Sequence, residues 1–489
     1  MHRIVAVAVA AATAAAAAAA PFSATAPQQV HLTLHPDADT LVAQWHSLAL
    51  GANRSALQYG AAPGALGHTV FGGDGSALSY VVDTCPGNSS RASYFAAFPA
   101  PRHADTFYRV SSDGGASWSA TFGPTRAPAP TRGDGSVSVS LFGDFGIETA
   151  PASNALSALV NDTRRGEAGH QLIVHFGDTA YNLNDECGAK GDRFLNAAQD
   201  YAAITPVACG SLLPTRATRD CRAQEPTSHS PPHPLPSLRS APKKGGNGNH
   251  ETGPEVGPYA FDYHEFLYRL APGQAFLAQA SNSTSVRWYS FFVEGTAAFF
   301  MLDADAWIYP AVYGLVQGQW EWLAAQLPLV DRTRFPWLVV VPHRAMYCTK
   351  TDDGECNSEA EALRYGQLGL FWGLEQLLVQ HGVDLVFAGH THHYEVTWPV
   401  VKGASTQHDY VNPRATVHVQ SGIAGTGPGG DPFDTPQQEW ERIRDKTFSP
   451  SYGKLLFHNA THLTYSQLYC ENATVFDSFV IEQHSHGPF

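Results

Sequence analysis

Hydrophobic and polar residues alternate in several short runs near the start of the chain. Alternation with a period of two, interrupted by Gly, Pro, Asp and Ser, predicts short strands. The runs cover residues 30–34, 41–45, 57–59, 92–96 and 106–110. Short strands at this spacing are typical of an all-β sandwich, which we expect over residues 27–123. The proline-rich segment 124–136 then predicts a linker.

From residue 137 to residue 489 the pattern changes, and apolar strands alternate with helical stretches, which predicts an α/β domain. Polar residues stand at five strand ends in this region. They are Asp144 in Gly-Asp, Asp178 and Tyr181 in Gly-Asp-x-x-Tyr, Asn249 and His250 in Gly-Asn-His-Glu, His343 after a strand, and His390 and His392 in Gly-His-x-His. Since the carboxyl ends of strands meet at one edge of an open α/β sheet, we expect these residues to form one site.

Taken one at a time, these motifs carry little information. A Gly-Asp pair usually makes a turn, and a single His is usually a hydrogen-bonded structural residue. The order and context of all five together are specific. The chain also contains 23 His, and imidazole is a common metal ligand, so the pattern favours a metal site.

The composition excludes two broad classes of protein. The chain has 489 residues, of which 44% are hydrophobic, so it can bury a large core and is not disordered as a whole. The 30 Lys and Arg against 44 Asp and Glu give a net charge of −14, and there is no local basic stripe. We therefore expect no nucleic-acid partner, because an acidic surface repels phosphate backbones.

The N-terminus predicts export. Residues 4–20 are uncharged and rich in Ala, and small residues follow them, which is typical of a signal peptide; we place it at residues 1–22. The alternative, a membrane anchor, needs a longer and more apolar segment, and no later stretch predicts a membrane span. We expect a secreted, extracellular protein, with the vacuole or lysosome as alternative destinations.

Two further features agree with export. Six Asn-x-Ser/Thr sequons predict N-glycosylation at Asn53, Asn88, Asn161, Asn282, Asn459 and Asn472. The seven Cys show no zinc-type spacing, and Cys348 and Cys356 close a short loop that we predict to be a disulfide. An odd number of Cys leaves at least one thiol to be explained.

The order of the five motifs resembles that of the purple acid phosphatases in the metallophosphoesterase superfamily. In that family, a Tyr in the position of Tyr181 distinguishes the purple enzymes from other metallophosphoesterases. The resemblance extends from Pro27 to Ile481. It implies a fibronectin type III-like N-terminal sandwich, followed by an α/β metallophosphoesterase domain in which a β-sheet sandwich is flanked by helices.

The resemblance also implies a set of ligands. Asp178 would bridge two metal ions. Ferric iron would be held by Asp144, Tyr181 and His392, and a divalent iron, zinc or manganese ion by Asn249, His343 and His390. Hard ferric iron suits carboxylate and phenolate oxygens, and a divalent ion of this kind suits imidazoles.

The implied activity is that of a secreted acid phosphatase acting on small phosphate monoesters by attack of a metal-bound hydroxide. Asn249 and His250 would bind the substrate, and His250 would help to protonate the leaving alcohol. One alternative is a metallophosphoesterase for phosphodiesters or nucleotide pyrophosphates. Another is an inactive glycosylated binding protein. A homodimer is left open.

The sequence departs from the family at two places. Plant members carry a further His about ten residues after the strand-terminal ligand, whereas residues 347–356 contain none, as in the animal branch. Asp352, Asp353 and Glu395 could contribute there, but we do not assign them a catalytic role, and we interpret His393 as a residue that lines the pocket.

The second departure is the segment 210–247, a proline-containing insertion without apolar periodicity inside a compact domain. We hypothesise that much of it is an unspliced intron translated in the gene prediction. A genuine disordered insertion is the alternative.

Overall fold

The computed structural model describes residues 24–51, 54–72, 77–81, 90–181, 183, 185–209, 271–308, 313–350, 354–425, 430–433 and 436–489. The expected signal peptide 1–22 and the insertion 210–247 lie outside these residues. So do Asn249, His250 and the sequon residues Asn53 and Asn88. Among the helices that the described ranges contain, none is long and apolar enough to cross a membrane.

The N-terminal region consists of two four-stranded antiparallel sheets. Trp45 stacks on Tyr94 with ring centroids 5.7 Å apart, and both rings lie in the core. The sheets have the orders β1-β2-β6-β5 (Gln28–Leu34, Thr40–Ser47, Ser90–Pro99, Ala77–Val81) and β4-β3-β7-β8 (His68–Phe71, Ala56–Gly60, Thr106–Ser111, Phe122–Thr125). The predicted sandwich is therefore present.

Strand pairing continues two residues into the segment that we expected to be a linker. Pro124 and Thr125 belong to β8, which pairs with β7 at the edge of its sheet. Proline is tolerated on an edge strand because its missing N–H can face away from the ladder. Proline content alone therefore did not locate the end of the last strand.

The larger region is built on two mixed sheets. One has the order β11-β10-β9-β23-β24-β25 (Val207–Cys209, Leu172–His175, Val137–Phe142, Ser451–Phe457, His462–Tyr469, Val475–Glu482). The other has the order β12-β13-β14-β17-β21-β18-β22 (Tyr289–Val293, Ala297–Met301, Trp337–Val341, Leu385–Ala388, Val417–Ser421, Tyr394–Thr397, Glu441–Asp445). Two short ribbons complete the strands: β15-β16 (Gly366–Gln367, Phe371–Trp372) and β19-β20 (Val400–Val401, Ala404–Ser405).

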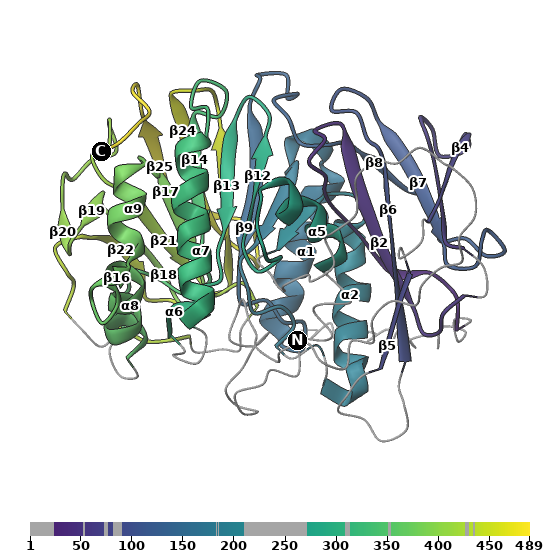
Figure 1. The fold of residues 1–489 in the computed structure, drawn as a ribbon, viewed down its shortest axis with the longest axis horizontal. Coiled ribbons are helices and arrows are strands. Elements are labelled where there is room, and N and C mark those ends of the chain that lie inside the picture. The colour runs from purple at the N-terminus through teal and green to yellow at the C-terminus, as the bar shows by residue number, and fades with distance from the viewer. Residues whose placement is uncertain are drawn as a thin grey trace, which may run out of the picture.

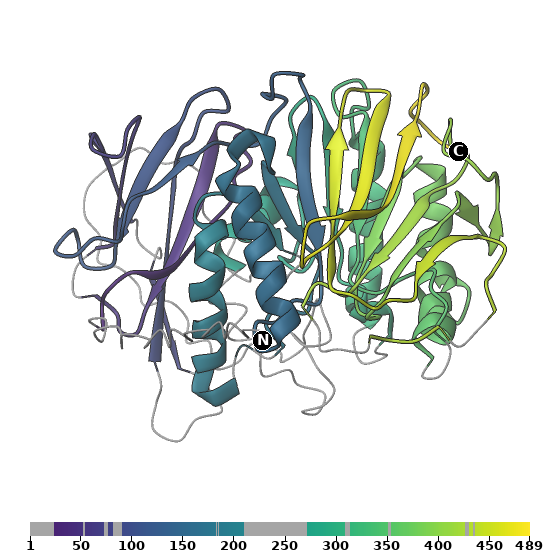
Figure 2. The same cartoon turned by 180° about the vertical axis from the view of Figure 1, so that it is seen from behind.

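Helices cover the outer faces of these sheets. The described helices are α1 (Ala150–Arg164), α2 (Ala189–Ala202), α5 (Ala271–Ala280), α6 (Asp305–Ile308), α7 (Tyr313–Gln326), α8 (Ala360–Tyr365) and α9 (Leu374–Gln380). In Figure 1 and Figure 2, α1 and α2 lie between the six-stranded sheet and the N-terminal sandwich, and α7 to α9 lie beyond the seven-stranded sheet. The expected fold class, a sandwich followed by a helix-flanked metallophosphoesterase domain, is confirmed.

The core explains why the strands of the seven-stranded sheet are apolar throughout. Along β14, Val339 and Val341 belong to the core that the two sheets share, whereas Leu338 and Val340 belong to the core under the helices. Side chains of a strand alternate between its faces, and both faces of this sheet are covered. A continuous run of apolar residues is therefore the expected sequence signal.

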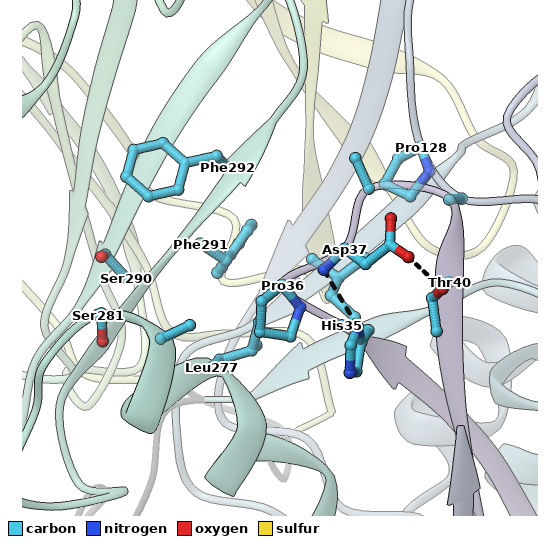
Figure 3. Close-up of a pocket in the computed structure, with 14 residues that line it drawn as sticks. His35, Pro36, Asp37, Thr40, Pro128, Leu277, Ser281, Ser290, Phe291 and Phe292 are labelled. Atoms are coloured by element: carbon cyan, nitrogen blue, oxygen red, sulfur yellow. Dashed lines mark hydrogen bonds between the residues drawn. The ribbon is translucent and has the colours of Figure 1, made fainter. Parts of the chain in front are cut away.

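A hollow of about 220 Å³ lies where the sandwich meets the larger region. Figure 3 shows His35, Pro36 and Asp37 on one side, and Phe291 and Phe292 on the other. Asp37 accepts a hydrogen bond from the Thr40 hydroxyl at 2.9 Å, which holds the turn between β1 and β2.

Candidate metal centre

All the predicted ligands that the structure describes gather at the carboxyl ends of strands. Asp144 follows β9, Asp178 and Tyr181 follow β10, His343 follows β14, and His390 and His392 follow β17. β9 and β10 belong to the six-stranded sheet, and β14 and β17 to the seven-stranded sheet. The site therefore lies where the edges of the two sheets meet.

Asp144, Tyr181 and His392 form one compact group, which we call the Asp144 group. Tyr181 Oη lies 3.0 Å from His392 Nε2 and 3.5 Å from Asp144 Oδ1, and His392 Nε2 lies 3.5 Å from the same Asp144 oxygen. These three atoms come from separate loops, and all can donate electron pairs to a cation. A carboxylate, a phenol and an imidazole form a donor set that suits ferric iron.

Asp178, His343 and His390 form the second group, which we call the Asp178 group. One ligand atom from each residue lies within 4.8 Å of the others. His343 Nε2 is 3.4 Å from Asp178 Oδ1, and His343 Nδ1 donates to the carbonyl of Phe176 at 3.0 Å. This hydrogen bond fixes the proton on Nδ1, so the lone pair of Nε2 points toward Asp178.

The two groups are connected through the backbone. The His390 N–H donates to both carboxylate oxygens of Asp144, at 3.0 and 2.9 Å. The Asp144 N–H donates to the carbonyl of Gly177 at 3.0 Å, next to Asp178. Residues of the two groups therefore hold one another in place, as in a site that binds two neighbouring ions.

Four of these predicted ligands have left-handed backbone conformations, which are rare for residues other than Gly. The φ angles are 58° for Asp144, 53° for Asp178, 50° for Tyr181 and 69° for His390. Such strain concentrates at functional sites, where the surrounding structure enforces it. The aspartate and histidine motifs thus mark sharp turns that aim their side chains into the site.

Glycine is required beside the ligands because the loops approach one another closely. A Cβ on Gly389 would lie 2.2 Å from Asp144 Oδ2, and a Cβ on Gly177 would lie 2.5 Å from His343 Nδ1. Gly177 also has a φ of 114°. Lack of space for a Cβ therefore explains the Gly of the Gly-Asp-x-x-Tyr and Gly-His-x-His motifs.

Burial sets the protonation of the site. It lowers the pKa of both His343 and His390 far below the usual value, and the charge of His390 lowers the pKa of His343 further, as Arg344 does for His390. Neutral imidazoles have the lone pair that a metal ion needs. Burial raises the pKa of Asp144 despite the neighbouring His392, and a cation in the site would reverse this effect by favouring the carboxylate.

Behind the Asp178 group lies a network of charges that we had not predicted. The Arg344 guanidinium donates to Asp305, to Glu359 at 2.5 Å and to His390 Nε2 at 2.6 Å. Glu355 Oε1 lies 3.1 Å from the same Nε2 atom. Arg344 and Glu355 therefore both contact Nε2 of His390.

The disulfide-bracketed loop extends this network to both groups. Cys348 and Cys356 are bonded in the structure. Between them, Lys350 Nζ lies 3.4 Å from Glu355 and 2.9 Å from Asp431. Asp431 in turn accepts a hydrogen bond from the His392 N–H at 2.7 Å. The loop therefore supports one His of each group.

One of our expectations about this region differs from the structure. His393 is fully buried, packs on the Phe433 ring and lies 3.3 Å from Glu395, so it supports the loop from inside. Glu395 is buried as well. The acid of this region that contacts a predicted ligand is Glu355, while Asp352 and Asp353 lie outside the described residues.

Two of the missed residues carried a signal in the sequence. Asp305 stands just after the apolar strand β13, as the other site residues follow their strands, so the same rule would have found it. Arg344, three residues after β14, follows the same rule, whereas Glu355 had no such signal, because its role depends on how two loops fold against each other.

Comparison with known proteins identifies the family. Residues 141–394, more than half of the chain, match the calcineurin-like phosphoesterases. The chain belongs to the calcineurin-like phosphoesterases. Residues 415–478 match the family described as iron/zinc purple acid phosphatase-like protein C, so the resemblance to the purple acid phosphatases is confirmed.

Relatives match nearly the whole chain. Acid phosphatase type 7 of Danio rerio is 29% identical over 95% of this chain and 93% of its own length. The Homo sapiens protein of the same name is 28% identical over 91% of this chain and 88% of its own length. The solved structure of purple acid phosphatase PPD1 from yellow lupin seeds shares the fold, with a TM-score of 0.63, 19% identity, and coverage of 94% of this chain and 75% of that chain.

The two groups fit the metal centre of such a phosphoesterase. Purple acid phosphatases use a dinuclear centre that contains iron. Here the oxygen-rich Asp144 group and the histidine-rich Asp178 group lie side by side, burial lowers the pKa of both imidazoles of the Asp178 group, and four of the ligands have left-handed backbone.

Proposed function

We propose that this calcineurin-like phosphoesterase is an acid phosphatase that hydrolyses small phosphate monoesters at a dinuclear metal centre. The observation that carries the proposal is the pair of adjacent ligand groups at the strand ends, which unite residues from four loops. The names of the relatives, acid phosphatase type 7, support the same activity.

We assign ferric iron to the Asp144 group and a divalent iron, zinc or manganese ion to the Asp178 group. Asp178 would serve both ions, and Asn249 would add a ligand to the second. The donor chemistry supports this assignment, because Tyr181 supplies a phenolate only to the Asp144 group, whereas two imidazoles serve the Asp178 group.

When bound, the two ions would lower the pKa of a water molecule, and their positive charge would attract the phosphate oxygens. The chain's own residues hold the reactants. His250, adjacent to Asn249, is proposed to bind the phosphate and to give a proton to the leaving alcohol as the ester P–O bond breaks and the water oxygen bonds to phosphorus. Arg344, Glu355 and Asp431 hold the ligands in orientation.

Replacement of Tyr181 by Phe tests this proposal, because it removes one oxygen from the Asp144 group and little else. We expect loss of visible absorption, loss of bound iron, and a fall in phosphate release below pH 6 of roughly 100-fold or more. Tyr59→Phe in the N-terminal sandwich is the matched control. A colourless wild-type protein that binds no metal and releases no phosphate would overturn the proposal.

The same assay separates the alternative substrates. Monoesters, diesters and nucleotide pyrophosphates are compared at equal concentration. Faster turnover of a diester or pyrophosphate would contradict the proposal that the enzyme is a monoesterase.

Size-exclusion chromatography with light scattering tests for the homodimer that the sequence leaves open.

We also propose that the protein is secreted and glycosylated. The four sequon residues that the structure describes, Asn161, Asn282, Asn459 and Asn472, are all exposed, which supports attachment of glycans. Expression in a eukaryotic host tests this: we expect the protein in the medium, an N-terminus near residue 23, and a loss of mass on treatment with an N-glycosidase. Retention inside the cell with an intact N-terminus would contradict secretion.

A further inference from the structure

A small cavity lies between the N-terminal sandwich and β10, and Thr179, the neighbour of Asp178, is part of its lining. Its volume is about 40 Å³, and its walls come from β1, β10, β11, α2 and α5. Most of the lining is apolar, for example Phe194 and Leu195. Pockets for organic ligands measure about 300–1,000 Å³, so this cavity is far too small for a metabolite.

Four polar side chains of the lining have an atom without a hydrogen-bond partner in the structure. The atoms are His31 Nε2, Thr33 Oγ1, His175 Nε2 and Gln274 Oε1. The four residues are at most 9% exposed. A buried polar atom without a partner is unfavourable, so four of them around one cavity indicate that something polar occupies it.

The two histidines present complementary groups to this space. His175 Nδ1 accepts a hydrogen bond from the Gly177 N–H at 3.4 Å, so the proton of the neutral ring is on Nε2, which acts as a donor. His31 Nδ1 donates to the Gln29 carbonyl at 3.0 Å, so its Nε2 is an acceptor. A metal ion does not bind an N–H group, whereas water accepts from one and donates to the other.

We propose that this cavity binds a cluster of water molecules that links the sandwich to the loop carrying Asp178. A buried water needs about 10–15 Å³, so the volume has room for about three or four. His175 Nε2–H and the Thr33 hydroxyl would donate to the cluster, and His31 Nε2 and Gln274 Oε1 would accept from it.

His175 is the residue through which the cluster reaches the metal centre. Its Nδ1 contacts the Gly177 N–H and the Thr179 hydroxyl, each at 3.4 Å, which are the neighbours of Asp178 on either side. A water bonded to Nε2–H holds the ring in the tautomer that accepts from Gly177. His175 is thus a positioning residue for Asp178, and this part of the inference rests on the proposed function.

The experiment compares Thr33→Val with Thr125→Val in the full chain. Both Thr hydroxyls are buried and lack partners in the structure, but Thr125 lies on β8 and does not line the cavity. Removal of a buried hydroxyl that has no partner leaves the stability of the folded protein unchanged or raises it. Removal of a hydroxyl that binds water lowers the stability, because the water loses a hydrogen-bond partner. We expect Thr33→Val to lower Tm by about 2 °C relative to Thr125→Val, and Thr33→Ser to restore it.

A crystal structure at high resolution and zinc binding to the apoprotein complete the test. Water density within hydrogen-bond distance of His175 Nε2 and Thr33 Oγ1 is expected, and an empty cavity or equal Tm values for the two Val variants would overturn the cluster. Zinc affinity should fall about threefold in Thr33→Val and stay unchanged in Thr125→Val. Unchanged affinity in both would overturn the positioning role. A wild-type apoprotein that binds none of zinc, iron and manganese would refute the proposed function while the water density and Tm values still stand.

Discussion

Single histidines in this chain have roles that their positions in the sequence do not distinguish. His343 and His390 present lone pairs to a metal site, whereas His170 lies in a purely structural pocket. His170 Nδ1 bonds to the Ser140 hydroxyl and Nε2 to the Thr163 hydroxyl, both at 2.8 Å. Burial lowers the pKa of His170 to about 3. A protein that works in acid therefore carries buried neutral imidazoles that acid destabilises.

His170 gives a prediction for the pH dependence of stability. Its pKa is about 3 when folded and near 6.5 when unfolded, so the unfolded chain binds more protons below pH 6.5. The contribution of neutral His170 to the free energy of unfolding is complete above pH 6.5 and is lost as the pH falls toward 3. At pH 5 the loss is about 2 kcal/mol. We expect His170→Gln to be less stable at pH 7 but to lose less stability between pH 7 and pH 5.

Thermal unfolding at both pH values measures this difference. The exposed His408→Gln serves as the control and should follow the wild type. A decline for His170→Gln as steep as that of the wild type would show that His170 is protonated in the folded state.

At the scale of elements, the site depends on loops that follow strands of two different sheets. The strand ends were predictable from apolar runs that stop at Gly-Asp, Gly-His or Pro-His, since each run must be buried and each break must turn. The contact of Glu355 with His390 was not predictable, because it depends on the path of the loop that Cys348 and Cys356 close. The edge strand β8 was missed because Pro124 favours a break in most contexts.

Glu355 gives a prediction for this loop. Its carboxylate lies 3.1 Å from His390 Nε2 and 3.4 Å from Lys350 Nζ. Glu355 therefore orients the ligand His390 and positions the Lys350 ammonium, which also pairs with Asp431. Substitutions of such supporting groups reduce metal affinity by 10- to 100-fold. We expect Glu355→Gln to weaken zinc binding to the apoprotein about tenfold.

Competition with a chromophoric chelator measures this affinity. Glu361→Gln changes an exposed acid a few residues away, and should leave the zinc affinity as in the wild type. Equal affinities for the two variants would mean that Glu355 is not needed to orient His390.

At the scale of the whole molecule, the N-terminal sandwich packs closely on the larger region. Asp192 on α2 accepts hydrogen bonds from Arg91 on β6 at 2.6 Å and from Gln29 on β1 at 2.9 Å, and the Arg91 side chain is only 9% exposed. The Tyr108 hydroxyl donates to the Ala203 carbonyl at 2.8 Å. The sandwich is therefore part of the framework that holds β10 and its ligands.

We predict that Asp192→Ala lowers the free energy of unfolding of the full chain by about 2–3 kcal/mol, because it removes the carboxylate that the buried Arg91 guanidinium contacts. Glu294→Ala is the control, since it breaks an ion pair with Arg334, whose side chain is 57% exposed, and should cost less than about 1 kcal/mol. Denaturant unfolding monitored by Trp fluorescence measures both. Similar losses of unfolding free energy in the two variants would contradict close packing between the sandwich and the larger region.

The order of the six-stranded sheet has a consequence for how the protein is made. β9, which leads to Asp144, is paired on one side with β10 and on the other with β23, where Leu141 faces Gly453 and Val137 faces Phe457. On the ribosome, β9 emerges long before β23, so one side of it stays open while all the ligand loops are synthesised. A chain that stops before residue 451 would contain every proposed ligand and still expose that strand edge to other chains, so it would aggregate before it could bind metal.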